Sequence, residues 1–247
     1  CCKARRLNAY RKLFLHAALS VFASPKHYKL HNEMYGEAIG NHFIVPPLIN
    51  PAIQPAAKEK NTVCFASQLC ANKGGNELVD FAIANPHMQV LVYGDDELGR
   101  QLPPNLSVKG KQPPPEVLTA LSKSEYFFFK PRLPEPCGRV AAEAFLSGCK
   151  TITNDRVGFH SNPYYPAYPE TALEEIQDAP YLFWQQVKNA VAVKIERNVR
   201  WKNVLIYKSF GGLGDFIFAL PAINKIVAVS DTVSLCVPTM LLSLLKK

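Results

Sequence analysis

The chain has 247 residues, 48% hydrophobic and 19% charged, a balance that excludes a disordered protein and favours a folded globular one. Its 28 Lys and Arg residues exceed its 20 Asp and Glu residues, and the net charge of +8 suits a phosphate-bearing ligand or an anionic surface. The longest apolar runs are too short to span a bilayer, and the seven cysteines contain no C-x-x-C pair, which argues against a zinc site or a disulfide scaffold.

Short apolar runs alternate with helical stretches along most of the chain. The N-terminal 49 residues predict a basic helix, a strand, a helix over PKHYKLHNEMYG and a further strand. Strands are predicted at residues 21–24, 42–49, 62–67, 89–94, 126–130, 150–155, 203–208 and 232–237. The other predicted helices cover residues 75–85, 114–123, 138–148 and 216–229. Continuously apolar strands separated by helices predict a parallel sheet covered on both faces, with ligands at the carboxyl ends of its strands.

The composition divides this pattern into four parts. Residues 1–49 form the end of one domain, and the Pro- and Ala-rich residues 50–60 predict a linker. Residues 61–192 predict a self-consistent α/β domain, and residues 193–247 begin a second α/β unit.

The segment CFASQLCANKGGNELVDF brings a lysine and two glycines together after a predicted strand. The strand ends near Ser67, the next loop carries Gln68 and Lys73, and Gly74-Gly75 opens a helix. Free N–H groups at a helix start, beside a lysine, can bind an anion. The same pattern also fits an ordinary strand-to-helix turn with a solvated lysine, since the P-loop spacing is absent.

Two carboxylates, eight positions apart, bound the segment EPCGRVAAE at residues 135–143. Glu135 lies in a proline-rich loop, and a helix is predicted to begin near Gly138 and to end at Gly148. Glu143 falls inside this helix between two alanines, where a carboxylate needs hydrogen-bond donors. Paired ribose hydroxyls would supply them. In the alternative, Glu135 caps the helix and Glu143 pairs with a lysine.

The order of these segments resembles retaining GT-B glycosyltransferases of family 4. The matching segments, within residues 20–190, are NHFIVPPLINP, CFASQLCANKGG, QVLVYG, LSVKG and EPCGRVAAEAFLSGCKTITND. The resemblance implies an α/β fold, with a Rossmann-like parallel sheet domain as the C-terminal half of a GT-B protein and partial α/β segments beside it. It implies that residues 1–49 are the end of the acceptor-side domain, that residues 61–192 are the nucleotide-sugar-binding domain, and that residues 193–247 begin a second glycosyltransferase-like unit. It also implies transfer of a sugar from a nucleotide-diphosphate donor to a hydroxyl, without a cofactor or a metal.

The resemblance implies a role for each matching position. Lys73 would contact the donor diphosphate, Glu143 the nucleotide ribose, and Glu135, the catalytic carboxylate, the donor sugar. Amides near Gly138 would hold sugar or phosphate, and Gly110 would lie by the base. The complete set of expected donor-binding residues is Gln68, Lys73, Gly110, Lys111, Gly138, Arg139, Val140 and Glu143.

Two positions depart from the family pattern. The usual Gly-Arg pair is replaced by Ser67-Gln68, which removes one of two expected diphosphate cations, and Arg139 or Arg156 could compensate. Cys137 stands where Phe is commoner. A chain that binds the donor without turning it over is therefore one alternative, and a GT-B nucleotide-sugar epimerase is another.

The C-terminal segment NVLIYKSFGGLGDFIFALPAINKI predicts a strand, a Gly-rich loop and a helix. GLGD followed by five residues and PA resembles the start of heptosyltransferases of the ADP-heptose type. In those heptosyltransferases, the aspartate that matches Asp215 is a proposed base that removes the proton of the acceptor hydroxyl, a role that a carboxylate can perform. In the alternative, a terminal β-α-β unit uses Asp215 as a helix cap.

The partners expected from this resemblance are a nucleotide sugar and a glycan or lipid-linked acceptor, in surface glycan or lipopolysaccharide biosynthesis. The scattered cysteines predict a reduced, cytoplasmic chain. Peripheral contact at the inner membrane face is a separate expectation. Nucleic acid is not an expected partner, because zinc-finger spacing and RNA-binding aromatic motifs are absent and most basic residues are dispersed. The absent initiator Met and the short acceptor side predict a fragment of a longer protein.

Overall fold

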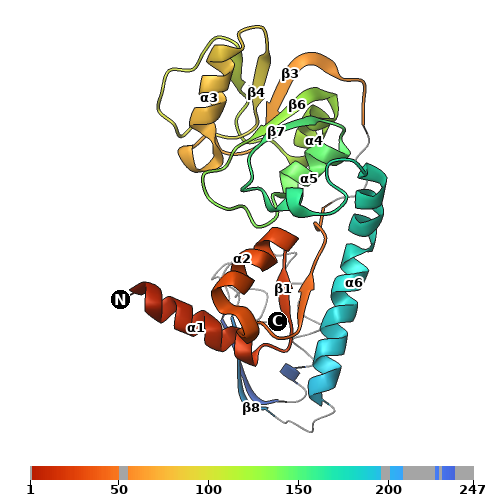
Figure 1. The fold of residues 1–247 in the computed structure, drawn as a ribbon. Helices are drawn as coiled ribbons and strands as arrows, with labels where there is room; N and C mark the ends of the chain where they lie inside the picture. The colour runs from red at the N-terminus through yellow and green to blue at the C-terminus, as the bar shows by residue number, and fades with distance from the viewer. Residues whose placement is uncertain (1, 50–54, 196–200, 208–225, 228–229, 237–247) are drawn as a thin grey trace, which may run out of the picture. The chain divides into compact units, whose positions relative to one another are not determined.

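The computed structural model describes residues 2–49, 55–195, 201–207, 226–227 and 230–236. The chain divides into two compact units, residues 1–187 and residues 188–247. The first unit holds an N-terminal segment and a five-stranded sheet domain (Figure 1). Every predicted site residue except Asp215 belongs to this unit.

The N-terminal segment consists of two helices and a pair of short parallel strands. Its elements are α1 (Cys2–His16), β1 (Ser20–Phe22), α2 (Pro25–Tyr35), the 3-10 helix η1 (Gly36–Ala38) and β2 (His42–Ile44). The α2 helix begins at Ser24, whose buried side chain accepts a hydrogen bond from the His27 N–H, with Pro25 in the first turn. Phe14 of α1 stacks on Phe22 of β1, and this contact packs α1 against β1.

The central sheet contains five parallel strands in the order β5-β4-β3-β6-β7. The strands are β3 (Glu59–Phe65), β4 (Gln89–Val92), β5 (Leu106–Val108), β6 (Ser124–Phe129) and β7 (Lys150–Thr153). The chain moves outward from β3 to β5 and then returns to the other side of β3 to form β6 and β7. This reversal makes the junction of β3 and β6 the topological switch point of the sheet.

Helices cover both faces of this sheet, as Figure 1 shows. The α3 helix (Gly75–Ala84) lies on one face, and α4 (Pro114–Lys123) and α5 (Arg139–Leu146) pack together on the other. This division follows from right-handed crossovers, because the direction of travel across the sheet reverses after β5. The last strand leads through the 3-10 helix η3 (Gly158–Ser161) to the long helix α6 (Pro169–Ile195).

The hydrophobic core lies between the sheet and its helices. In β3 the four residues from Thr62 to Phe65 are all buried, as expected for a central strand covered on both faces. Small residues on α5 let the helix approach the sheet closely, since Ala141, Ala142 and Ala144 are fully buried. The largest fully buried aromatic side chains are Tyr164, Phe65, Phe127, Phe128 and Phe159.

In the second unit, β8 (Trp201–Tyr207) and β9 (Ser230–Cys236) pair in parallel. The predicted strands at 203–208 and 232–237 are therefore present. Most of the predicted helix at 216–229 lies outside the described residues, as does Asp215.

The fold class predicted from the sequence is confirmed: the chain contains a Rossmann-like parallel α/β sheet. Two elements were not predicted, β5 and α6. Three residues are too few for a periodic signal in β5, and Pro180 inside α6 interrupts an otherwise helical pattern. No helix among the described residues is long and apolar enough to cross a membrane.

Candidate functional site

The candidate site lies where two loops leave the carboxyl ends of β3 and β6. These strands are neighbours at the switch point, so residues 66–74 and residues 130–138 meet there although they are distant in sequence. Both loops lead directly into helices, α3 and α5. Two helix starts therefore direct their free N–H groups to the same edge of the sheet.

The loop after β3 presents Lys73 at the end of a short 3-10 helix, η2 (Ala71–Lys73). Gly74 follows in the left-handed region with a φ of 87° and caps α3. A Cβ at Gly74 would overlap the backbone carbonyl of Lys130, at the start of the loop after β6. Glycine is therefore required here, and it fixes the approach of the two loops.

The loop after β6 is held in place by backbone hydrogen bonds on both sides of Glu135. The Glu135 N–H donates to the Arg156 carbonyl over 2.9 Å, and the Gly158 N–H donates to the Glu135 carbonyl over 2.8 Å. The Phe159 N–H donates to the Cys137 carbonyl over 2.7 Å. These contacts hold Glu135 in position before α5 begins.

Lys73 and Glu135 form an ion pair between the two loops, with 2.7 Å between Nζ and Oε2. Their side chains are 37% and 26% exposed, so both remain accessible to a ligand. The Lys73 ammonium also lies 5.9 Å from the centre of the Phe129 ring. The pair borders a cavity of about 370 Å³. The residues lining it are Ala66, Ser67, Lys73, Phe129, Glu135, Pro136, Cys137, Gly138, Arg139 and Val140.

Glu143 is half-buried on α5, one turn beyond the residues that line the cavity. Burial raises the pKa of its carboxyl group, and the positive charge of Arg139 opposes this rise. Among the described residues, none donates a hydrogen bond to the Glu143 carboxylate or forms an ion pair with it. The Glu143 carboxylate is therefore available to accept hydrogen bonds from a ligand that has donors.

Cys137 lies among charged groups at the cavity wall. The pKa of its thiol is raised to about 11: burial is the main cause, the positive charge of Arg139 opposes the rise, and the charges of Glu135 and Glu143 add to it. The two carboxylates predicted to act together therefore both influence Cys137. At neutral pH this group is a thiol and does not act as a nucleophile.

We expect the alkylation of Cys137 by iodoacetamide to be slow at pH 7 and to accelerate about tenfold per pH unit toward pH 10, because only the thiolate reacts. A ligand in the cavity, such as UDP, should slow the reaction at Cys137 and leave that at Cys70, which does not line the cavity, unchanged. Peptide mass spectrometry at several pH values measures both rates. A pH-independent rate at Cys137 would contradict the raised pKa.

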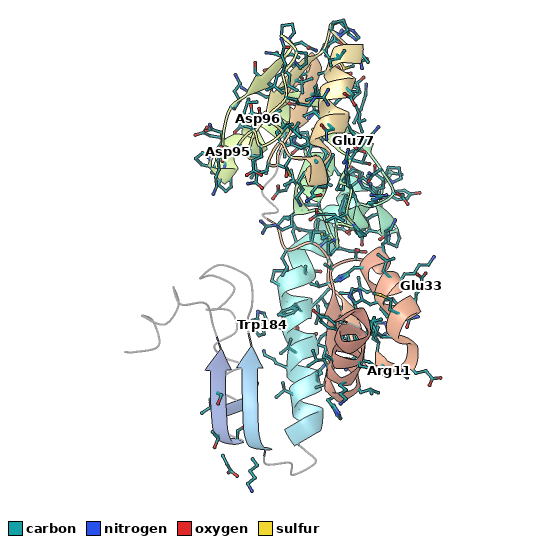
Figure 2. The ribbon with its side chains drawn as sticks, turned by 90° about the vertical axis from the view of Figure 1, so that its left-hand side faces the viewer. Arg11, Glu33, Glu77, Asp95, Asp96 and Trp184 are labelled. Atoms are coloured by element: carbon teal, nitrogen blue, oxygen red, sulfur yellow. The ribbon has the colours of Figure 1, made fainter. Side chains whose placement is uncertain are left out.

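Other predicted donor-binding residues lie apart from the cavity. Gln68 is exposed, and its amide donates to Glu97 over 2.8 Å, so it does not face Lys73. Gly110 and Lys111 follow β5, two strands from the switch point, and do not line the cavity. Asp95 and Asp96, labelled in Figure 2, belong to the loop after β4, the strand that lies between β5 and β3 in the sheet. Asp215 lies outside the described residues.

The structure also brings in residues that the sequence did not single out. The Ser24 hydroxyl, on the N-terminal segment, donates to the Pro136 carbonyl over 2.5 Å. Gly158 lies so close that a Cβ there would overlap both Pro136 and Ser24. A contact over 112 positions has no local signal in one sequence. The sequence is compatible with this contact because Ser24 and Gly158 are small, and small residues permit such a close approach.

No protein-family model matches this chain, and no curated protein matches it. Solved structures do match. HepE of Anabaena, in complex with UDP and glucose, has a TM-score of 0.51 and 17% identity over 70% of this chain and 56% of its own. TarM has a TM-score of 0.51 and 12% identity over 69% of this chain and 38% of its own. AviGT4, a glycosyltransferase involved in avilamycin A biosynthesis, matches at 16% identity over 72% of this chain and 64% of its own, with a TM-score of 0.43.

The feature shared with HepE and TarM is the fold. The sheet domain has the Rossmann-like architecture of its GT-B neighbours. The chain spans 64%, 38% and 56% of the lengths of AviGT4, TarM and HepE, which is less than two thirds in each case.

Proposed function

We propose that this chain is the donor-binding part of a GT-B glycosyltransferase that takes a sugar from a nucleotide-diphosphate donor. The observation that carries the proposal is the cavity at the switch point, where Lys73, Glu135 and the start of α5 meet. Open α/β sheets bind ligands at this place, and helix starts favour phosphates there. The fold shared with HepE, which was solved with UDP and glucose, supports the same proposal.

The proposed roles follow from the chemistry of each group. The Lys73 ammonium has three N–H donors, so it can hold a diphosphate oxygen while it stays paired with Glu135. The N–H groups of Arg139 and Val140, in the first turn of α5, would bind phosphate or sugar oxygens. Glu135 would accept hydrogen bonds from the sugar hydroxyls, and Glu143 from those of the ribose.

These groups favour transfer by positioning and by charge stabilisation, without a metal ion. The bond between the anomeric carbon and the diphosphate oxygen breaks, and its electron pair leaves with the diphosphate held by Lys73. The acceptor oxygen forms the new bond to the anomeric carbon, and its proton passes to the departing diphosphate. Retention of configuration and a hexosyl donor are part of the proposal and rest on the family resemblance.

For the whole protein, we propose an acceptor hydroxyl on a glycan or a lipid-linked carrier, in surface glycan or lipopolysaccharide biosynthesis. We also propose a cytoplasmic location with peripheral contact at the inner membrane face. The α1 helix supports this contact, because its sequence CKARRLNAYRKLFLH contains basic and no acidic residues. We keep Gly110 and Lys111 as proposed neighbours of the base and Gln68 as a residue near the donor. For the separate unit begun by residues 193–247, we keep Asp215 as a proposed acceptor-side base.

Titration calorimetry with UDP, GDP, ADP and their sugar derivatives tests the proposal. At least one nucleotide diphosphate should bind saturably, and Lys73→Met should weaken that binding at least about tenfold, since a charged hydrogen bond is lost. Lys60→Met removes the same charge at the amino end of β3, the opposite edge of the sheet, and should have no effect. If no nucleotide binds, or if Lys60→Met weakens binding equally, the donor site is wrong.

A further inference from the structure

A second cavity, of about 460 Å³, adjoins the proposed donor cavity. Glu135 and Pro136 line both cavities, so one short stretch of the loop after β6 separates them. The far wall of the second cavity is α2, which contributes Lys26, His27, Leu30, His31, Glu33 and Met34. The two cavities thus approach each other at the carboxylate that faces the donor sugar in our proposal.

The α2 wall is fixed to the sheet domain at its N-terminal end. The Ser24 hydroxyl donates to the Pro136 carbonyl, and the Lys26 N–H donates to the Ser161 hydroxyl over 2.9 Å. The helix also contacts η3. The second cavity is therefore a built feature of the first unit.

His27 and His31 both line the cavity, and their rings carry hydrogen on opposite nitrogens. The Ala23 N–H lies 3.1 Å from Nδ1 of His27 and donates to it, so Nδ1 is unprotonated and the neutral ring carries its hydrogen on Nε2. Nδ1 of His31 lies 2.9 Å from the His27 carbonyl, which can only accept, so Nδ1 carries the hydrogen and Nε2 is an acceptor. The two rings lie 4.6 Å apart. Burial, together with the neighbouring His31, lowers the pKa of His27 and keeps it neutral.

The rest of the lining favours a neutral ligand with an apolar part. Leu30, Met34, Pro134 and Pro136 make the cavity mainly apolar. Its two strong cations already have partners. Lys26 pairs with Asp155 at 3.7 Å, and a guanidinium nitrogen of Arg156 donates to the Arg132 carbonyl. Glu33, labelled on α2 in Figure 2, is exposed and also lines the cavity, so that two carboxylates, Glu33 and Glu135, balance the two cations.

We propose that this second cavity binds the acceptor, a neutral alcohol that carries an apolar group. Nε2 of His27 would donate a hydrogen bond to its hydroxyl, and Nε2 of His31 would accept one from it. A hydroxyl both donates and accepts, so it matches the two Nε2 atoms at once. The inference rests on the proposed function, because the hydroxyl must meet the sugar beside Glu135. It assigns a binding role to two histidines of α2.

Nitrogen-15 NMR of the histidine-labelled chain, titrated with n-octyl β-D-glucopyranoside below its micelle concentration, tests this proposal. The ring nitrogen shifts should report hydrogen on Nε2 of His27 and on Nδ1 of His31 before any ligand is added. Octyl glucoside should shift both rings, and free glucose should bind about tenfold more weakly, because it lacks the apolar group.

The variants separate the hydroxyl contact from damage to the fold. His31→Leu should weaken octyl glucoside binding about tenfold, and His31→Gln, whose amide oxygen can still accept, should weaken it less than about threefold. His87→Leu, an exposed change at the amino end of β4, should have no effect. Affinity for UDP should stay the same in all three variants. Opposite tautomers, no octyl glucoside binding, or equal loss in both His31 variants would overturn the acceptor proposal. Failure of the native chain to bind any of UDP, GDP, ADP and their sugar derivatives would instead overturn the proposed function.

Discussion

Replacement of Glu143 by alanine should lower the affinity for the bound nucleotide about 100-fold. The half-buried carboxylate makes no hydrogen bond or ion pair with any described residue, and two ribose hydroxyls would donate to it. Each charged hydrogen bond contributes about 1.5 kcal/mol, and a factor of ten corresponds to 1.4 kcal/mol. Calorimetry with UDP, or with the nucleotide that binds best, measures the change.

Folding of the variant and pH provide the controls. Burial raises the pKa of Glu143 in the folded state, so ionisation of this carboxyl group lowers the stability of the fold. This loss of stability is absent below the normal pKa of a glutamate and appears as the pH rises through the higher pKa of the folded state. Glu143→Gln should therefore be at least as stable as the native chain at pH 7. Nucleotide affinity should fall as the pH drops through the raised pKa, since a neutral carboxyl accepts more weakly. Glu174→Ala, on the exposed side of α6, should bind normally. If Glu143→Ala binds as well as the native chain while Lys73→Met does not, the ribose assignment is wrong.

Gly74→Ala should destabilise the sheet domain by roughly 2–5 kcal/mol, from left-handed strain and from overpacking. Its φ of 87° disfavours any side chain, and the added methyl group would overlap the Lys130 backbone. The two loops must then separate, which breaks the contact between Lys73 and Glu135. Urea denaturation measures the free energy of unfolding, and UDP affinity should fall in parallel.

Gly99→Ala is the matched control. Gly99 also has a positive φ, 64°, but no atom lies within 4 Å of the position of an added Cβ. This variant should lose only the cost of the backbone strain, about 1–2 kcal/mol. Equal losses in Gly74→Ala and Gly99→Ala would show that the close approach of the two loops contributes nothing.

Much of the sheet domain could be predicted from local patterns. Buried strands need continuous apolar runs, so β3, β4 and β6 were predicted close to their observed bounds. The edge strand β7, with no fully buried residue, was also predicted close to its bounds. Glycines mark the ends of α5, because Gly138 and Gly148 have the positive φ values that end or begin a helix. The spacing of residues 135–143 correctly predicted one carboxylate in a loop and the other within a helix.

The sequence by itself therefore determined the fold class and which side chains lie at the ends of the strands, because apolar periodicity and glycine conformation are local properties. Only the tertiary structure decided which of these side chains meet. Strand order brings Lys73 to Glu135, 62 positions away, and the loop after β4 turns Gln68 toward Glu97 instead. The orientation of the His27 and His31 rings depends on hydrogen bonds with the backbone of Ala23 and His27 and on ring contacts with Phe22 of β1. Their place beside residues 134–136, across the second cavity, is set by the tertiary structure alone.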